Sequence, residues 1–409
     1  MSHLPQLKIG FISYEFPTDT GNGGIGTYVK QMAAAIAAVD VQIHVFVGSK
    51  ERVGSVYTEG YNVHFIKCIN GDEFREQVVS VFDKQQAIGP FSLIESPEIN
   101  GNAWEVKKKY INIPLVVRLH APNHLVEKLK KKYIPFFAKL RFVLGAIRRL
   151  KFDLGYWQAY DKTSDPDYQF IQLADYITAP SVAMKNWVVK NWKIDAHKIT
   201  VIPNLFSPSP SLLNIPINEV ETYNEVVFFG RLNALKGLVN ATRAMKVILK
   251  LYPDWSFKVI GDDGPGPSNV LTMRNWMVKE LKDFSHQVEF IDGLPYEELP
   301  AAIAQSEIVL LPSLFESFSY TCAEAMAAGK AVIGSDNAAM ADLLQHGKSG
   351  LLVNPYDFEA IIAALKKIIN NNTLRVQLST QARIRIINDF NSQNTLNAFM
   401  EFYKKVIVE

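Results

Sequence analysis

Apolar, mostly β-branched runs alternate with stretches of helical periodicity along the first half of the chain. The apolar runs predict buried strands, because a strand covered on both faces of a sheet is apolar throughout, and residues 25–38 and 74–86 predict helices. The predicted strands are KIGFISY (from Lys8), VQIHVFV, NVHFIKC, LIES, PLVVRLH, ADYITAPS and KITVIPN. This alternation predicts a parallel sheet with helices on both faces.

A second series of the same kind follows LFSPSPSLLNIPINEVET, a Pro- and Ser-rich segment that reads as a domain boundary. Its predicted elements are EVVFFGR, a helix near 234–251, SFKVIGD, a helix near 273–283, VEFIDG, ELPAAIAQ, IVLLPS, a helix over 320–328, AVIGS and LLVN. We therefore predict an α/β protein of two Rossmann-like, doubly wound domains that face each other across a cleft. The domains are expected at 1–204 and 205–390, with helix 391–409 packing back on the first.

Composition adds few constraints beyond a soluble globular class. The chain has 409 residues and 48% hydrophobic content, enough for two large cores. Only Cys68 and Cys322 are present, too few for a disulfide framework or a thiolate metal site, which favours a reducing compartment. The opening residues lack a signal-peptide pattern, and no apolar run approaches the ~20 residues of a membrane span. A cytoplasmic location is expected.

The net charge of +2 hides one strongly basic segment, residues 128–151. It holds nine Lys or Arg and no Asp or Glu, so the rest of the chain is net acidic. The apolar residues that lie among these charges include Phe136, Phe137, Leu140, Phe142, Val143, Leu144 and Ile147. Such interleaving is typical of a helix at a membrane interface, and it predicts peripheral association with an anionic membrane surface.

The alternative interpretation of this segment is a helix whose charged face is solvated and whose apolar stripe packs on the core. Nucleic acid is not expected as a partner, since no reading motif accompanies the charge.

The stretch TGNGGIGTYVKQ contains Gly21, Gly23 and Gly26 in the G-x-G-x-x-G spacing of dinucleotide folds. In that fingerprint the first glycine follows directly on a strand, whereas EFPTDT intervenes here. The second strand also ends without the acidic residue that would hold a ribose hydroxyl. The sequence therefore predicts a glycine loop that caps a helix and offers backbone N–H groups to some anion.

Charged residues of the second domain gather at predicted strand ends. Arg231 and Lys236 follow EVVFFG, where two cations suit a diphosphate. Glu316 lies in the loop after IVLLPS, and Glu324 lies in the next helix. The backbone N–H groups between them form a helix N-terminus that favours an anion, and they belong to Phe318, Ser319, Tyr320 and Thr321. A carboxylate beside a phosphate would be repelled, so Glu316 is expected to accept hydrogen bonds from sugar hydroxyls.

Several motifs together resemble the retaining glycosyltransferases of family 4, which have the two-domain GT-B fold. They are the Glu316-x7-Glu324 spacing, EAMAAGKAVIGSD, GRLNALKG and KSGLLVNP. The glycine loop, ADYITAPS, VIPN and the tail FNSQNTLNAFMEFY are also similar to family patterns, so the resemblance covers nearly the whole chain. It implies transfer of a sugar from a nucleoside-diphosphate donor to an acceptor hydroxyl with retained anomeric configuration.

The resemblance also implies a role for each matching residue. Glu316 would bind hydroxyls of the transferred sugar, with backbone N–H groups of Phe318 and Ser319 nearby, and Glu324 would bind the nucleotide ribose. The other implied contacts are the diphosphate for Arg231 and Lys236, the donor phosphates for Gly23 and Gly24, the base for Leu294, and the reacting sugar for His120.

Two departures from the family pattern stand out. Ser319 occupies a position where the family usually has Gly, and the insert GDDGPGPSN contains Asp262 and Asp263. The two aspartates lack the spaced partners of a Mg²⁺ or Ca²⁺ site, and the family uses protein cations at the leaving diphosphate, so no metal is expected.

Two other functions compete with sugar transfer. A nucleotide-sugar 2-epimerase shares the fold, and a non-catalytic sugar-nucleotide-binding module would need fewer of the charged residues. No nucleophilic carboxylate is evident on the facing loops of the first domain, where Glu95 and Glu98 of IESPEING are candidates only. The donor base, the sugar and the acceptor, whether lipid-linked or a polysaccharide precursor, are not identified by the sequence.

Overall fold

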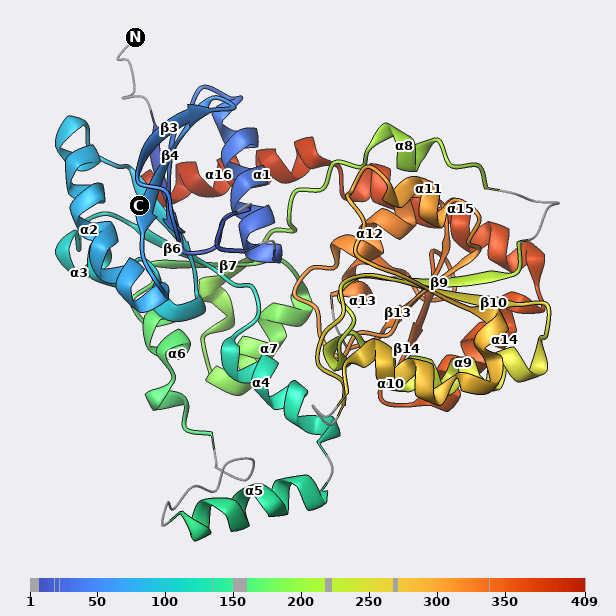
Figure 1. Cartoon of the computed structure of the whole chain (residues 1–409). Coiled ribbons are helices and arrows are strands. Elements are labelled where there is room, and N and C mark those ends of the chain that lie inside the picture. Colours follow the sequence, from blue (N-terminus) through green and yellow to red (C-terminus); the bar gives the residue numbers. More distant parts are fainter. Residues whose placement is uncertain are drawn as a thin grey trace. The chain divides into compact units, whose positions relative to one another are not determined.

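The computed structural model of the chain describes residues 7–17, 19–21, 23–134, 136–149, 160–217, 223–267, 271–337 and 339–408. The described residues divide into two compact units (Figure 1). The first comprises those within 1–123, 161–205 and 391–409, and the second those within 124–160 and 206–390. Segment 124–160 therefore groups with the second unit, although the sequence analysis assigned it to the first domain.

The first unit is built on an eight-stranded sheet in the order β3-β4-β2-β1-β5-β6-β7-β8. All neighbouring strands are parallel except β3 and β4, which form an antiparallel hairpin. The strands are β1 (Lys8–Ser13), β2 (Gln42–Ser49), β3 (Gly54–Thr58), β4 (Tyr61–Lys67), β5 (Leu93–Pro97), β6 (Leu115–Arg118), β7 (Tyr176–Ala179) and β8 (Ile199–Val201).

Helices cover both faces of this sheet. On one face, Val45 and Val47 of β2 belong to a core that includes residues of the first and last helices. On the other face, the ring of Phe46 lies 5.4 Å from that of Phe82 in the second helix. The α-helices of this unit are α1 (Gly24–Ala37), α2 (Gly71–Ile88), α3 (Trp104–Lys109), α6 (Pro166–Ile171), α7 (Val182–Trp192) and α16 (Ser392–Val408). The alternation of β2 residues between two cores is the expected pattern for a doubly wound sheet.

A buried polar cluster fixes α16 in the first unit. The hydroxyls of Tyr403, on α16, and Tyr28, on α1, each donate to a different carboxylate oxygen of Glu95, both at 2.6 Å. The guanidinium of Arg118 lies 5.2 Å from the ring of Phe399 and donates to the Ile202 carbonyl. Burial raises the pKa of Glu95. The carboxylate therefore joins the last helix to the sheet.

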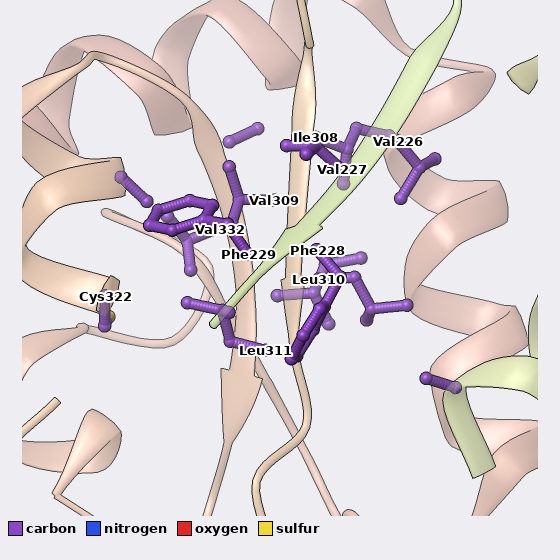
Figure 2. Close-up of a cluster of buried hydrophobic side chains, with 14 of the residues drawn as sticks. Val226, Val227, Phe228, Phe229, Ile308, Val309, Leu310, Leu311, Cys322 and Val332 are labelled. Carbon is purple, nitrogen blue, oxygen red and sulfur yellow. The ribbon is translucent and has the colours of Figure 1, made fainter. Parts of the chain in front are cut away.

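The second unit contains a six-stranded, fully parallel sheet in the order β11-β10-β9-β12-β13-β14. Figure 2 shows its centre, where side chains of the two middle strands pack on both sides of the sheet. These strands are apolar at nearly every position, as a sheet buried on both faces requires. The strands are β9 (Glu225–Phe229), β10 (Ser256–Ile260), β11 (Val288–Ile291), β12 (Ile308–Leu311), β13 (Ala331–Ser335) and β14 (Leu351–Val353).

The helices of the second unit include two long ones near the carboxyl end of the chain, α14 and α15, that the sequence analysis did not assign. They are amphipathic and contribute Ile361, Leu365 and Leu378 to the core. The α-helices are α4 (Asn123–Lys130), α5 (Phe136–Arg148), α8 (Pro210–Leu213), α9 (Leu238–Leu251), α10 (Met273–Glu280), α11 (Leu299–Ile303), α12 (Tyr320–Ala327), α13 (Met340–Leu343), α14 (Phe358–Ile369) and α15 (Asn372–Asp389).

Strand β3 was also not predicted from the sequence, and neither were helices α3, α6, α7, α8 and α13. All five residues of β3 are exposed, so it carries no buried apolar run. Its hairpin turn uses Glu59 and Gly60, both at positive φ, which is the type I′ geometry that short hairpins prefer. A strand held only by pairing to its neighbour leaves little hydrophobic signal in the sequence.

Candidate donor-binding site

The loop after β9 is shaped by three backbone features. The Asn233 side chain caps the 3-10 turn Ala234–Lys236 by accepting from the Lys236 N–H at 3.2 Å. Gly237 has φ +73°, and a Cβ there would lie 1.8 Å from the Pro312 carbonyl oxygen, so only glycine fits. The Leu314 N–H donates to the Leu235 carbonyl at 2.7 Å. The loops after β9 and β12 are thereby joined.

This junction brings Lys236 and Glu316 into contact. Lys236 Nζ lies 2.6 Å from Glu316 Oε1, and the Ser313 hydroxyl donates to the same oxygen at 3.1 Å. The two charged side chains are 26% and 14% exposed, so a ligand can reach both. Ser313 is itself buried, and its carbonyl accepts from the Ser335 hydroxyl. The sequence indicates the two charged residues but carries no signal for their ion pair or for the supporting role of Ser313.

Ser319 begins helix α12 as its N-cap. Its hydroxyl accepts from the Cys322 N–H at 3.3 Å and lies 3.1 Å from the Thr321 hydroxyl. The ring of Phe318 is buried and packs edge-on against Tyr320, with centroids 5.1 Å apart. A glycine cannot supply this side-chain cap. The serine that departs from the family pattern is therefore accounted for by local helix capping.

Glu324 lies on α12 in a half-buried position. Burial raises the pKa of Glu324 to about 7, against an opposing effect of the Lys236 charge. Tyr296 is close enough for the Glu324 charge to raise its pKa further, beyond the effect of burial. Two residues before this tyrosine, Leu294 is partly buried and packs on the domain core. The carboxylate and the loop after β11 thus lie together, and Tyr296 was missed although it stands beside Leu294 in the sequence.

Arg231 and the aspartate insert occupy neighbouring loops of the same sheet. Arg231 directly follows β9 and Gly230, and its side chain is exposed. Asp263 Oδ1 accepts from the N–H groups of Gly264 and Arg274, so this oxygen is engaged in shaping its own loop. Asp262 packs closely on Gly293. A Cβ added at Gly293 would lie 2.2 Å from the Oδ1 of Asp262. Ser268 and Asn269 of the insert lie outside the described residues.

In the first unit, the glycine loop is held by Thr20. Its hydroxyl donates to the Tyr14 carbonyl at 2.5 Å and accepts from the Phe16 N–H at 3.1 Å. Gly23 is the N-cap of α1, and a Cβ at Gly24 would meet nothing within 4 Å. Residues 14–23 separate β1 from α1, so the strand, turn and helix start of a dinucleotide fingerprint do not coincide here. Asn22 lies outside the described residues.

His120 follows β6 and is buried against Tyr28, whose ring lies 5.3 Å away. Its backbone N–H donates to both carboxylate oxygens of Glu98, at 3.0 and 2.9 Å. Burial and the nearby Arg118 lower the pKa of His120 to about 3, so the imidazole is neutral at pH 7. Within the described part of the chain, its buried Nε2 has no hydrogen-bond partner. This nitrogen is itself shielded from solvent, so a ligand hydroxyl reaches it only if the side chains around it move.

Glu98 is fully buried beside a second carboxylate, Asp167. Burial, with a smaller effect of Asp167, raises the pKa of Glu98 to about 8. Asp167 accepts from the backbone N–H groups of Asn100 and Asn123, at 2.9 and 2.8 Å. Both candidate nucleophiles of the sequence analysis, Glu95 and Glu98, are therefore buried and hydrogen-bonded within the protein.

Two family models match the chain. The Glycosyltransferase Family 4 model matches residues 22–209, and the Glycosyl transferases group 1 model matches residues 214–385. The D-inositol 3-phosphate glycosyltransferase of Corynebacterium urealyticum is 24% identical over 416 residues, which cover 94% of this chain and 91% of the relative.

Two solved structures share the fold over nearly all of the chain. Sucrose-phosphate synthase from Thermosynechococcus elongatus has a TM-score of 0.73 at 19% identity, covering 98% of this chain and 100% of that one. Anabaena HepE in complex with UDP and glucose has a TM-score of 0.67 at 16% identity, with 98% and 100% covered. The matches favour sugar transfer over epimerisation. The chain belongs to the family 4 glycosyltransferases, has the GT-B fold, and transfers a sugar from a nucleoside-diphosphate donor.

Proposed function

We propose that the chain transfers its sugar with retention of anomeric configuration and without a required metal ion. The observation that most directly supports a donor site in the second unit is the Lys236–Glu316 contact, 2.6 Å long, at the carboxyl ends of β9 and β12. A cation and a carboxylate at one point suit a ligand that joins a diphosphate to a sugar. When the donor binds, its diphosphate pairs with the Lys236 ammonium and replaces Glu316 as the partner of that cation. The sugar hydroxyls then donate hydrogen bonds to the Glu316 carboxylate.

The other residue roles follow the same chemistry. Arg231, exposed after β9, adds a second cation for the diphosphate, and the N–H groups of Gly23 and Gly24 bind donor phosphate oxygens. The backbone N–H groups at the start of α12 bind the donor near its sugar. The Glu324 carboxylate accepts hydrogen bonds from the ribose hydroxyls, and Leu294 contacts the base. Nε2 of His120 forms a hydrogen bond with a hydroxyl of the sugar.

Retention is proposed to proceed on one face of the sugar. The bond between the anomeric carbon and the phosphate oxygen breaks, the acceptor oxygen bonds to the same face, and the acceptor proton passes to the departing phosphate. A double displacement would need an accessible carboxylate on the first unit. Glu95 is occupied by two tyrosine hydroxyls, and Glu98 is buried and bonded to the His120 N–H. These contacts favour the single-face path.

Metal independence is proposed because protein cations can stabilise the leaving diphosphate. Among the described residues, no three His, Cys, Asp or Glu side chains form a group that could hold a metal ion. Asp263 belongs to the one aspartate pair that the sequence suggested for a metal site. Its Oδ1 instead accepts hydrogen bonds from the backbone N–H groups of Gly264 and Arg274.

The acceptor is proposed to be a lipid-linked sugar or a polysaccharide precursor, reached from the cytoplasm at the inner face of the membrane. Both Cys68 and Cys322 are unpaired and buried, which suits a reducing compartment. No helix among the described residues is long and apolar enough to cross a membrane.

Donor turnover with product analysis tests the proposal. Nucleoside-diphosphate hexoses are screened by thermal shift, and the stabilising donor is incubated with candidate acceptors in EDTA and in Mg²⁺ or Mn²⁺. We expect the product, examined by proton NMR, to keep the anomeric configuration of the donor, and the rate to change less than about twofold in EDTA. Inverted product would overturn retention, and activity that only a metal restores would overturn metal independence.

The raised pKa of Glu324 predicts a pH-dependent nucleotide affinity. A carboxyl with a pKa of about 7 is largely protonated at pH 6, whereas hydroxyl donors of a ribose stabilise its ionised form. Nucleotide affinity should therefore rise as pH increases through 7, by about tenfold for each unit by which binding lowers the pKa. Calorimetry at pH 6, 7 and 8 measures this. In Glu324→Gln, the only pH dependence of nucleotide affinity that remains should be that of the nucleotide phosphate itself. If this variant kept the pH dependence of the unchanged protein, the assignment of Glu324 would be wrong.

A further inference from the structure

Helix α5 carries an apolar stripe along one side. At 3.6 residues per turn, five large apolar residues of this helix fall within about a third of its circumference. They are Phe136, Phe137, Leu140, Leu144 and Ile147. We call this set the α5 stripe.

The α5 stripe faces solvent instead of a protein core. Its five side chains are 63%, 80%, 38%, 58% and 56% exposed, in sequence order, whereas Ala146, off the stripe, is 3% exposed. A helix in a globular domain normally buries its apolar side and exposes the other. The packing alternative of the sequence analysis, a core stripe under a solvated face, does not describe α5. An exposed stripe of this size indicates an interaction surface.

Basic residues border the stripe. Lys139 lies along one edge, and Arg141 and Arg148 lie along the other, with no Asp or Glu from Lys128 to Arg149. Leu150 and Lys151, the end of the predicted basic segment, lie outside the described residues. Long basic side chains beside apolar ones can extend to the polar layer of a membrane while the apolar residues enter it.

The lysines before α5 are used differently. Lys130 forms an ion pair with Glu127 at 2.8 Å, and the Lys132 ammonium lies 3.0 Å from the centre of the Tyr356 ring. These contacts engage part of the basic segment within the second unit. The basic residues best placed to meet an external partner are therefore those of α5.

We propose that α5 lies in the surface of an anionic membrane, with the α5 stripe in the headgroup layer and its basic residues on anionic lipid headgroups. The charge of the helix complements that of such a surface, and the stripe supplies apolar contact that a soluble polyanion lacks. The docked enzyme takes a lipid-anchored acceptor, and this part rests on the proposed function. Sugar transfer would thereby occur where the acceptor is concentrated.

Vesicle flotation tests the docking. The full-length protein is mixed with vesicles of phosphatidylcholine alone or with 30% phosphatidylglycerol, at about 50 and 500 mM salt. We expect binding to the anionic vesicles at low salt, and at least about tenfold weaker binding to neutral vesicles or at high salt. Equal binding to both lipid compositions, or none to either, would overturn the proposal.

Two sets of variants separate charge from apolar contact. The charge set is Lys139→Ala, Arg141→Ala and Arg148→Ala, and the apolar set is Phe137→Ser, Leu144→Ser and Ile147→Ser. Each cation near an anionic surface contributes about fivefold, so the charge set should lower partitioning by at least about 100-fold. The apolar set should lower it by at least about tenfold while charge is unchanged. Binding that depends on charge alone would indicate a soluble polyanion partner and overturn the membrane assignment.

Matched controls use exposed residues elsewhere. Lys246→Ala, Lys250→Ala and Lys279→Ala remove charge from other helices of the same unit, and Val53→Ser with Tyr57→Ser removes exposed apolar side chains near the β3 hairpin. Both control sets should bind vesicles as the unchanged protein does. Equal losses in the controls would contradict a role specific to α5.

Activity without vesicles distinguishes this proposal from the proposed function. Donor hydrolysis in solution should be equal, within about twofold, in the α5 variants and the unchanged protein. Wild-type turnover without vesicle binding would refute docking and leave sugar transfer intact. Vesicle binding without turnover of any donor would support docking and count against the proposed reaction.

Discussion

Glu316→Ala is expected to abolish detectable sugar transfer while the free nucleoside diphosphate still binds. The carboxylate is proposed to touch only the sugar, and each lost hydrogen bond to a charged group costs about 1.5–3 kcal/mol, or more than tenfold. Because Glu316 holds Lys236 in the free protein, its removal should also leave nucleotide affinity unchanged or tighter. Calorimetry with the nucleotide and a turnover assay with the sugar donor measure the two effects separately.

Glu324→Ala provides the contrast, and Glu289→Ala provides the control. Glu324 is proposed to bind the ribose, so its loss should weaken nucleotide affinity by about tenfold or more. Glu289 is an exposed carboxylate of β11, and its removal should change neither quantity. If the Glu316 and Glu324 variants behaved alike, or with their effects exchanged, the assigned roles would be wrong.

Lys236→Ala is expected to lower kcat by about 10²–10³-fold. The leaving diphosphate gains charge as its bond to the sugar breaks, and loss of one positioned donor at such a charge costs about 2.7–4 kcal/mol. Lys236→Arg should retain part of the activity, since it keeps the charge but changes its position. Steady-state rates at saturating donor measure the effect.

A double-mutant cycle with Glu316 tests whether Lys236 acts on the substrate or only through its ion pair. If Lys236 merely oriented Glu316, the double variant would bind the nucleotide as tightly as the Glu316 variant alone. We expect the double variant to lose additional nucleotide affinity, because Lys236 binds the diphosphate directly. Lys246→Ala, an exposed lysine of α9, should leave rate and affinity unchanged. A rate loss of less than about threefold for Lys236→Ala would contradict its catalytic role.

Local sequence patterns predicted the two-sheet architecture well. Each buried strand of both sheets is an apolar run, because burial acts on every residue of such an element. Helices α3, α6 and α7, which connect strands of the first sheet, were not predicted. The hairpin strand β3 left no such signal, since all its residues are exposed. The charged residues proposed for the donor site do follow strand ends, where ligand-binding residues of parallel sheets usually lie, and their roles stay predictions.

Contacts within the site could not be read from the sequence. The pairing of Lys236 with Glu316 depends on a close approach between Gly237 and Pro312, which lie 75 positions apart. The support from Ser313 and the proximity of Tyr296 to Glu324 likewise come from neighbouring strand ends. Two glutamates with similar sequence surroundings, Glu95 and Glu98, acquired distinct partners from a distant helix and a neighbouring loop.

The sequence by itself determined the fold class and the family, and it supplied the residues proposed for the donor site, because these depend on local periodicity and on motifs that stay within one loop. Only the tertiary structure decided the direction of the α5 stripe, the partners of Glu95 and the position of segment 124–160 with the second unit. Amphipathic periodicity specifies that a helix has an apolar side. Whether that side meets a core or solvent depends on what packs against it, and distant residues supply that packing.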